Sequence, residues 1–180
     1  MDAAETAAAA ATTTANHSSS RRTLLQYLEE KANLSREMVE DLLRFGAIWY
    51  SPIPPLPKTQ LLDEETQELI LRIRSEKLKL MTRGQIADFS KRKRALRLNI
   101  SHIDMAIEWG SFIRVHCHPI RFDAVYTVDW PKRIIAESEH YVVLNKPEGV
   151  PVPATVDNLV ETCLAQTATA IGAYIQGGGE

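Results

Sequence analysis

The first apolar residues of the chain are spaced for two short helices followed by a strand. Residues 22–33 are predicted to form a helix whose leucines share one face. Ser35 would cap a second helix, because its hydroxyl can accept a free backbone N–H of the first turn. Gly46 would end that helix in a left-handed conformation, which glycine adopts easily. Residues 48–50 would then form a strand.

Beyond a proline-rich break after Ser51, the pattern predicts one long helix and then several strands. Asp63 would cap the helix, which would run to about Met81. From about Phe112 the apolar period changes to two, which is typical of strands. The predicted strands cover residues 112–118, 124–128, 134–135 and 141–144. Asp157 would cap a last short helix.

Charge is unevenly distributed along the 180 residues, although the formal net charge is only −2. Residues 72–97 contain ten Lys or Arg and two acidic residues, whereas residues 134–180 contain one Lys and six acidic residues. The densest basic run is Lys91-Arg92-Lys93-Arg94. Such a run attracts phosphate through counterion release. A solvated helix face has the same composition, so charge alone leaves both interpretations open.

The composition excludes several classes of protein. No run approaches the roughly 18 apolar residues of a membrane helix, and two cysteines cannot form a disulfide framework. A reducing compartment is therefore expected. His116 and His118 would share one face of a strand, so they offer at most two ligands, and no metal is expected. The three tryptophans are expected in the core or at an interface.

Residues 22–50 resemble the S4-type RNA-binding domain in their order of helix, turn, helix, Gly and strand. The resemblance is carried by Arg36 just after the second cap, by Arg44 before Gly46, and by Ile48-Trp49-Tyr50. It implies that these cations contact RNA phosphate, which sets position and affinity without reading sequence.

A more specific resemblance lies in residues 141–152. Leu144-Asn145-Lys146-Pro147-Glu148-Gly149, between two apolar strands, resembles the segment that opens the catalytic domain of RluA-like RNA pseudouridine synthases. Residues 112–122 are similar to the linker strand of the plant organellar members. The resemblance implies isomerisation of uridine to pseudouridine in RNA, without a metal or organic cofactor. One Asp would act on a nucleotide flipped out of its stack.

The catalytic Asp that this family implies is expected to be absent. The family carries it in a motif of the type His-Arg-Leu-Asp, and no Asp in the last third of the chain follows Arg-Leu. Arg121-Phe122-Asp123 precedes the opening segment, which is the wrong order. We therefore expect a fragment or alternative product of a longer enzyme of tRNA or rRNA processing, inactive by itself.

The predicted fold class is α+β. A small S4-like module with a basic helical insertion would lead into the first strands of an incomplete pseudouridine-synthase sheet. Residues 1–21 would be a disordered or targeting segment. Residues 22–130 would be the S4-like RNA-binding region, with the insertion at about 52–110. Residues 131–180 would be part of the catalytic domain.

No catalytic residue is predicted, and the predicted site residues bind RNA. They are Arg22, Arg36, Arg44, Lys91, Arg92, Lys93 and Arg94. Lys146 and Pro147 would form a loop near the active site, where Lys146 either contacts a phosphate or is solvated. The expected partner of this monomer is a structured rRNA or tRNA, with no membrane, metal or cofactor.

Two other functions stay open. One is a non-enzymatic S4-type RNA- or ribosome-binding adaptor, and the other is a helical protein-interaction domain with no RNA role. The small and hydroxylated residues 1–20, followed by Arg21 and Arg22, resemble a transit peptide and favour a chloroplast or another organelle. Asp2 and Glu5 argue for the cytoplasm or nucleus instead.

Overall fold

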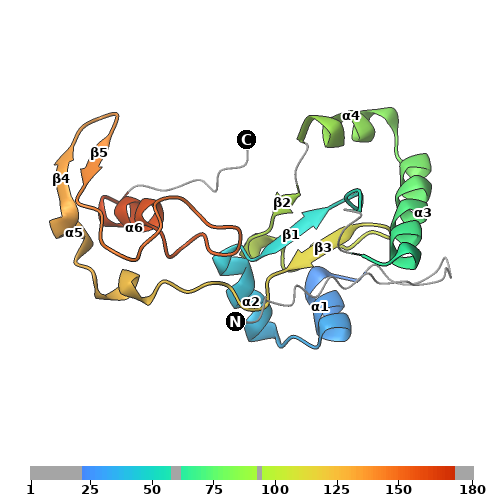
Figure 1. The fold of residues 1–180 in the computed structure, drawn as a ribbon, viewed down its shortest axis with the longest axis horizontal. Coiled ribbons are helices and arrows are strands. Elements are labelled where there is room, and N and C mark those ends of the chain that lie inside the picture. Colours follow the sequence, from blue (N-terminus) through green and yellow to red (C-terminus); the bar gives the residue numbers. More distant parts are fainter. Residues whose placement is uncertain (1–21, 58–61, 93–94, 173–180) are drawn as a thin grey trace.

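The computed structural model describes residues 22–57, 62–92 and 95–172. This part of the chain combines helices with two small antiparallel sheets, so the α+β class is confirmed. The elements are α1 (Leu24–Ala32), α2 (Arg36–Phe45), β1 (Ile48–Ser51), α3 (Glu64–Leu80), α4 (Arg83–Arg92), β2 (Leu96–Arg97), the 3-10 helix η1 (Ile100–His102), β3 (Phe112–Val115), the 3-10 helix η2 (Asp123–Thr127), α5 (Trp130–Arg133), β4 (Ile134–Glu137), β5 (Val142–Leu144) and α6 (Cys163–Ala170). Figure 1 shows an elongated arrangement, with α3 and α4 at one end and the β4–β5 hairpin at the other.

Both predicted helices near the amino-terminal side form where expected. Thr23 caps α1 in a capping box with Gln26. The Ser35 hydroxyl accepts a hydrogen bond from the Met38 N–H and caps α2. Gly46 ends α2 with φ at 66°, in the left-handed region that favours glycine.

β1 is the central strand of the first sheet, between β2 and β3. It pairs antiparallel with both neighbours, and Ile48 lies opposite Val115 while Tyr50 lies opposite Ile113. Because side chains alternate across a strand, these four point to one face of the sheet. That face packs against α1 and α2. The resulting first core is built on Leu24, Leu25, Leu28, Val39, Leu42, Leu43, Ala47, Ile48 and Leu98.

α3 and α4 both lie within the predicted insertion. Asp63 caps α3 through the Thr66 N–H, as expected. Lys77 of α3 is only 7% exposed, and its ammonium group lies 2.8 Å from a Glu108 carboxylate oxygen. A buried ammonium is costly unless it is paired, so this contact fixes α3 against the segment before β3.

A second core lies around the β4–β5 hairpin, α5 and α6. It contains Val125, Trp130, Val150 and Cys163. The hairpin confirms the two strands predicted after residue 133, and its pairing is antiparallel. Trp130 is therefore a core residue, whereas 46% of Trp109 is exposed. Within the described residues, none of the helices has both the length and the apolar character needed to span a lipid bilayer.

Two expectations of the sequence are wrong. The strand predicted over residues 124–128 does not form, and Asp123–Thr127 make the 3-10 helix η2 instead. They find local partners instead of a neighbouring strand: the Val125 N–H donates to the Phe122 carbonyl, and the Thr127 hydroxyl to the Ala124 carbonyl. A strand would also have needed a neighbouring strand to pair with its backbone groups.

Asp157 does not cap the last helix. Thr162 caps α6 through the Ala165 N–H. The Asp157 carboxylate is occupied elsewhere, by the Ile120 N–H at 3.0 Å and the Thr155 hydroxyl at 3.0 Å. The predicted strand over 112–118 is also shorter in the structure, where β3 ends at Val115.

Candidate nucleic-acid interface

The predicted cations of the two amino-terminal helices are exposed, but each has an acidic neighbour. Arg36 Nε lies 2.9 Å from Glu40, and Arg44 lies 3.1 Å from Asp41. Both arginines also face Glu40, since Arg44 reaches its second oxygen at 4.0 Å. Exposed pairs of this kind contribute only about 0–1 kcal/mol. A phosphate group can therefore compete with these carboxylates for Arg36 and Arg44.

The structure does not gather all the predicted RNA-binding cations on one surface. Arg22, just before α1, pairs with Glu30 at 2.9 Å. Lys91 and Arg92 end α4, which lies far from α2 in Figure 1. Lys93 and Arg94 lie outside the described residues. The basic run from Lys91 to Arg94 and the cations of α2 are therefore treated as two separate groups of candidate contacts.

The predicted loop near the active site follows β5. Pro147 is buried, and Gly149 adopts φ at 72°. The Asn145 N–H donates to the Arg133 carbonyl at 2.8 Å, which ties the start of the loop to the end of α5. The Lys146 ammonium donates to the Pro147 carbonyl at 3.0 Å and remains exposed. This Lys is therefore available to an anionic ligand.

A buried carboxylate that the sequence did not single out organises the connection between the two cores. Glu161 is fully buried and accepts hydrogen bonds on both oxygens. Its Oε1 receives Arg121 Nε at 2.9 Å, Arg121 Nη2 at 2.6 Å and the Tyr126 hydroxyl at 2.7 Å. Its Oε2 receives the Phe122 N–H at 2.7 Å and Asn158 Nδ2 at 2.8 Å.

The surroundings of Glu161 keep it ionised. Burial alone would raise the pKa of its carboxyl, because a charge in a low-dielectric interior is unfavourable. The hydrogen bonds from Arg121, the Phe122 N–H, Tyr126 and Asn158 outweigh burial and lower the pKa to about 2. The same carboxylate raises the pKa of the Tyr126 hydroxyl, since it stabilises the protonated donor.

Asp157 and Asn158 reinforce this connection through the backbone of Ile120. Asp157 accepts the Ile120 N–H, and Asn158 Nδ2 donates to the Ile120 carbonyl at 2.8 Å. The backbone N–H and the carbonyl of Ile120, which lies between β3 and η2, are therefore both held by side chains of segment 155–162. Asp157 and Asn158 are 4% and 0% exposed, so water does not compete for these contacts.

Segment 155–162, which holds these side chains, also docks on the first sheet and on α2. Three hydrogen bonds make the contact: the Leu159 N–H to the Phe45 carbonyl at 2.8 Å, Trp49 Nε1 to the Val156 carbonyl at 2.9 Å, and Arg97 Nη2 to the Thr155 carbonyl at 2.6 Å. The two cores are thus joined by a polar network as well as by the covalent chain between them. No sequence signal predicted the network, because most of its contacts join distant residues. Arg121, Phe122 and Tyr126 lie 35 to 40 positions from Glu161, and Trp49 lies 107 positions from Val156.

Comparison with known proteins identifies the class: the chain is homologous to RNA pseudouridine synthases, which confirms the resemblance seen in the sequence. It is 32% identical over 148 residues to "RNA pseudouridine synthase 6, chloroplastic" of Oryza sativa subsp. japonica, an alignment that covers 82% of this chain and 31% of the relative. It is also 32% identical over 146 residues to the protein of the same name from Arabidopsis thaliana, covering 81% of this chain and 30% of that relative.

The chain therefore spans about a third of the length of these curated relatives. No family model matches the chain. No solved structure matches it either.

Proposed function

We propose that this chain is the RNA-binding part of an RNA pseudouridine synthase, and that it lacks the catalytic Asp. The observation that carries the proposal is the 32% identity to curated pseudouridine synthases over four-fifths of the chain. That relationship favours a synthase over a non-enzymatic RNA- or ribosome-binding adaptor, because both relatives bear the name of the enzyme.

The RNA-binding role rests on the S4-like order of α1, α2 and β1 and on two groups of cations. Arg36 and Arg44 lie exposed on α2 and are held only by weak surface pairs. The run from Lys91 to Arg94 adds four positive charges within four residues. Both groups would bind phosphate of a structured rRNA or tRNA, whose shape rather than sequence is recognised.

The catalytic part rests on residues 131–172. The Lys146–Pro147 loop leaves β5 as the family resemblance implies, and the hairpin exposes large apolar side chains. The three most relevant are Ile135 at 67%, Tyr141 at 65% and Val143 at 41% exposure. Exposed apolar strand faces are unfavourable in water. They are what an incomplete sheet would leave open, which supports the inference of a partial catalytic domain.

The buried network around Glu161 would then align the two parts. Uridine isomerisation requires that the RNA held by the cations also reaches the loop near the active site. Because segment 155–162 hydrogen-bonds to β1, α2 and the linker, it would fix that alignment. An organellar location belongs to the same proposal, since the names of both relatives include the word "chloroplastic".

RNA binding can be tested on the full chain with a structured RNA and matched variants. Replacing Lys91, Arg92, Lys93 and Arg94 by Ala removes four charges from the dense run. The control removes the same charge from exposed positions outside it: Arg72, Lys79, Arg83 and Lys132. The first variant should weaken binding by at least about tenfold at moderate salt, and the control by much less. Equal losses would mean that the dense run has no special role.

The absence of the catalytic group can be tested by tritium release. Isomerisation joins uracil to ribose through C5, so the C5 hydrogen is lost to water. RNA labelled at C5 of uridine should release no tritium above background with this chain. Sustained turnover would contradict the proposal that the catalytic Asp is missing, and would direct the search to Asp123, Asp129 and Asp157.

A further inference from the structure

The face of the first sheet that turns away from α1 and α2 carries a row of charged and aromatic side chains. Trp49 on β1 lies opposite Arg97 on β2 and opposite Arg114 on β3. Cross-strand partners point to the same side of a sheet, so the three form a row of Arg, Trp and Arg. Ser51 lies opposite Phe112 two positions further along, and therefore on the same face.

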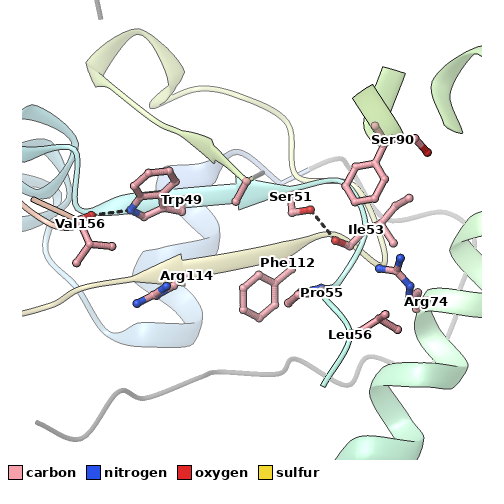
Figure 2. A pocket seen from close by; sticks show the side chains of 12 residues that line it. Trp49, Ser51, Ile53, Pro55, Leu56, Arg74, Ser90, Phe112, Arg114 and Val156 are labelled. Carbon is pink, nitrogen blue, oxygen red and sulfur yellow. Dashed lines mark hydrogen bonds between the residues drawn. The ribbon is translucent and has the colours of Figure 1, made fainter. Parts of the chain in front are cut away.

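This row borders a groove of about 700 Å³ between the sheet and the insertion. Three aromatic side chains line it, Trp49, Phe89 and Phe112, together with the guanidinium groups of Arg74 and Arg114. No acidic side chain is among the described residues that line it. Figure 2 shows Arg114 and Phe112 along β3 beside Trp49 of β1, with Arg74 entering from α3.

The aromatic and cationic groups of the groove are fixed to different degrees. The Trp49 ring is held in place by its bond to the Val156 carbonyl and by the Arg97 guanidinium, 4.6 Å from the ring centre. Arg74 donates to the Pro54 carbonyl. Arg114 is exposed and has no ion pair within the described part of the chain. The groove thus combines a rigid aromatic wall with a cation that is available to an anion.

Two residues that flank the basic run in the sequence line the groove. Ser90 and Ala95 both line it, and in the sequence they bracket Lys91, Arg92, Lys93 and Arg94. At the other end, Val156 of segment 155–162 lines it too. A ligand along the groove would therefore also reach segment 155–162.

We propose that this groove binds an unpaired RNA segment, with bases stacked on Trp49 and Phe112 and a phosphate on Arg114. The inference rests on the proposed RNA-binding function and adds a distinct site to it. Aromatic platforms beside cations are the general solution for single strands, because every base has a face that can stack. A duplex cannot use this groove, since its bases are already stacked on each other.

The experiment measures binding of a fluorescent oligouridine of about ten nucleotides to the full chain. Arg114→Glu should weaken binding by at least about tenfold, because it reverses a charge at the groove. Arg72→Glu is the matched control: Arg72 is exposed, and two helical positions turn it about 200° away from Arg74 around α3. It should change binding by less than about threefold. Equal effects of the two variants would overturn the inference.

Stacking on Trp49 gives a second readout that does not depend on charge. Oligouridine should quench part of the tryptophan emission, and Trp49→Phe should abolish that quenching while Trp109→Phe preserves it. Circular dichroism and a thermal melt establish that each variant is folded, and Arg114→Gln replaces Arg114→Glu if the latter is not. Quenching that survives Trp49→Phe would contradict stacking at this site.

The outcomes separate this site from the proposed function. If structured RNA binds and oligouridine does not, the groove inference fails and the proposed function stands. If neither RNA binds, both fail. Saturable binding of an apolar dye that oligouridine does not displace would also overturn the inference, and would indicate an apolar peptide as the occupant.

Discussion

At the scale of single residues, the most informative side chain is Glu161. A fully buried carboxylate is stable only where donors satisfy both oxygens, and here five donor groups do so. Its main ion-pair partner, Arg121, is also stacked on Phe45, with the guanidinium 4.5 Å from the ring centre. The Glu161 carboxylate therefore holds residues 121–126 against segment 155–162. Through Arg121 it also holds them against the end of α2.

Replacing Glu161 by Gln should destabilise the chain and remove part of its acid sensitivity. The folded pKa is about 2, below the ordinary 4.5, so the carboxylate stabilises the fold above about pH 4.5. That contribution is lost as the pH falls from 4.5 towards 2. Glu161→Gln should lower the free energy of unfolding by roughly 3 kcal/mol at pH 7, measured by urea denaturation, and flatten the pH dependence in this range.

Glu139→Gln is the control, because Glu139 is exposed in the turn between β4 and β5. It should leave the free energy of unfolding within about 0.5 kcal/mol of the unchanged chain. If both variants behaved alike, Glu161 would not be the centre of the network.

At the scale of elements, local signals identified some segments and not others. Ser35, Gly46 and Asp63 marked helix ends correctly, because a cap is a contact between near neighbours in sequence. Residues 124–128 alternate like a strand, yet no strand in the described part of the chain pairs with them, and Asp123–Thr127 form η2. Asp157 has the residue type of a cap, but a distant backbone group, the Ile120 N–H, uses its carboxylate instead.

The Ser35 cap gives an element-scale prediction. Ser35→Ala removes the acceptor of the Met38 N–H and should lower the free energy of unfolding by about 1 kcal/mol. Ser75 lies exposed inside α3, where Ala has the higher helix propensity. Ser75→Ala should therefore be neutral or slightly stabilising in the same urea denaturation. A neutral Ser35→Ala would show that α2 does not depend on this cap.

At the scale of the whole molecule, the chain has a first core with the proposed RNA-binding surface, a second core with the Lys146–Pro147 loop, and a polar network between them. The sequence predicted the class, the helices of the first core and the hairpin of the second. It did not predict the network, the row formed by Arg97, Trp49 and Arg114, or the groove. Those depend on strand register and on contacts between distant segments, which local periodicity does not encode.

The central claim is that this chain binds RNA through phosphate contacts, and a salt titration tests it most directly. Association of the full chain with a structured RNA should weaken linearly in a plot of log K against log salt concentration. With the cations of α2 and the basic run engaged, at least about four phosphates should be neutralised, which gives a slope of roughly −3 or steeper. A slope near zero, or no binding at low salt, would contradict the account.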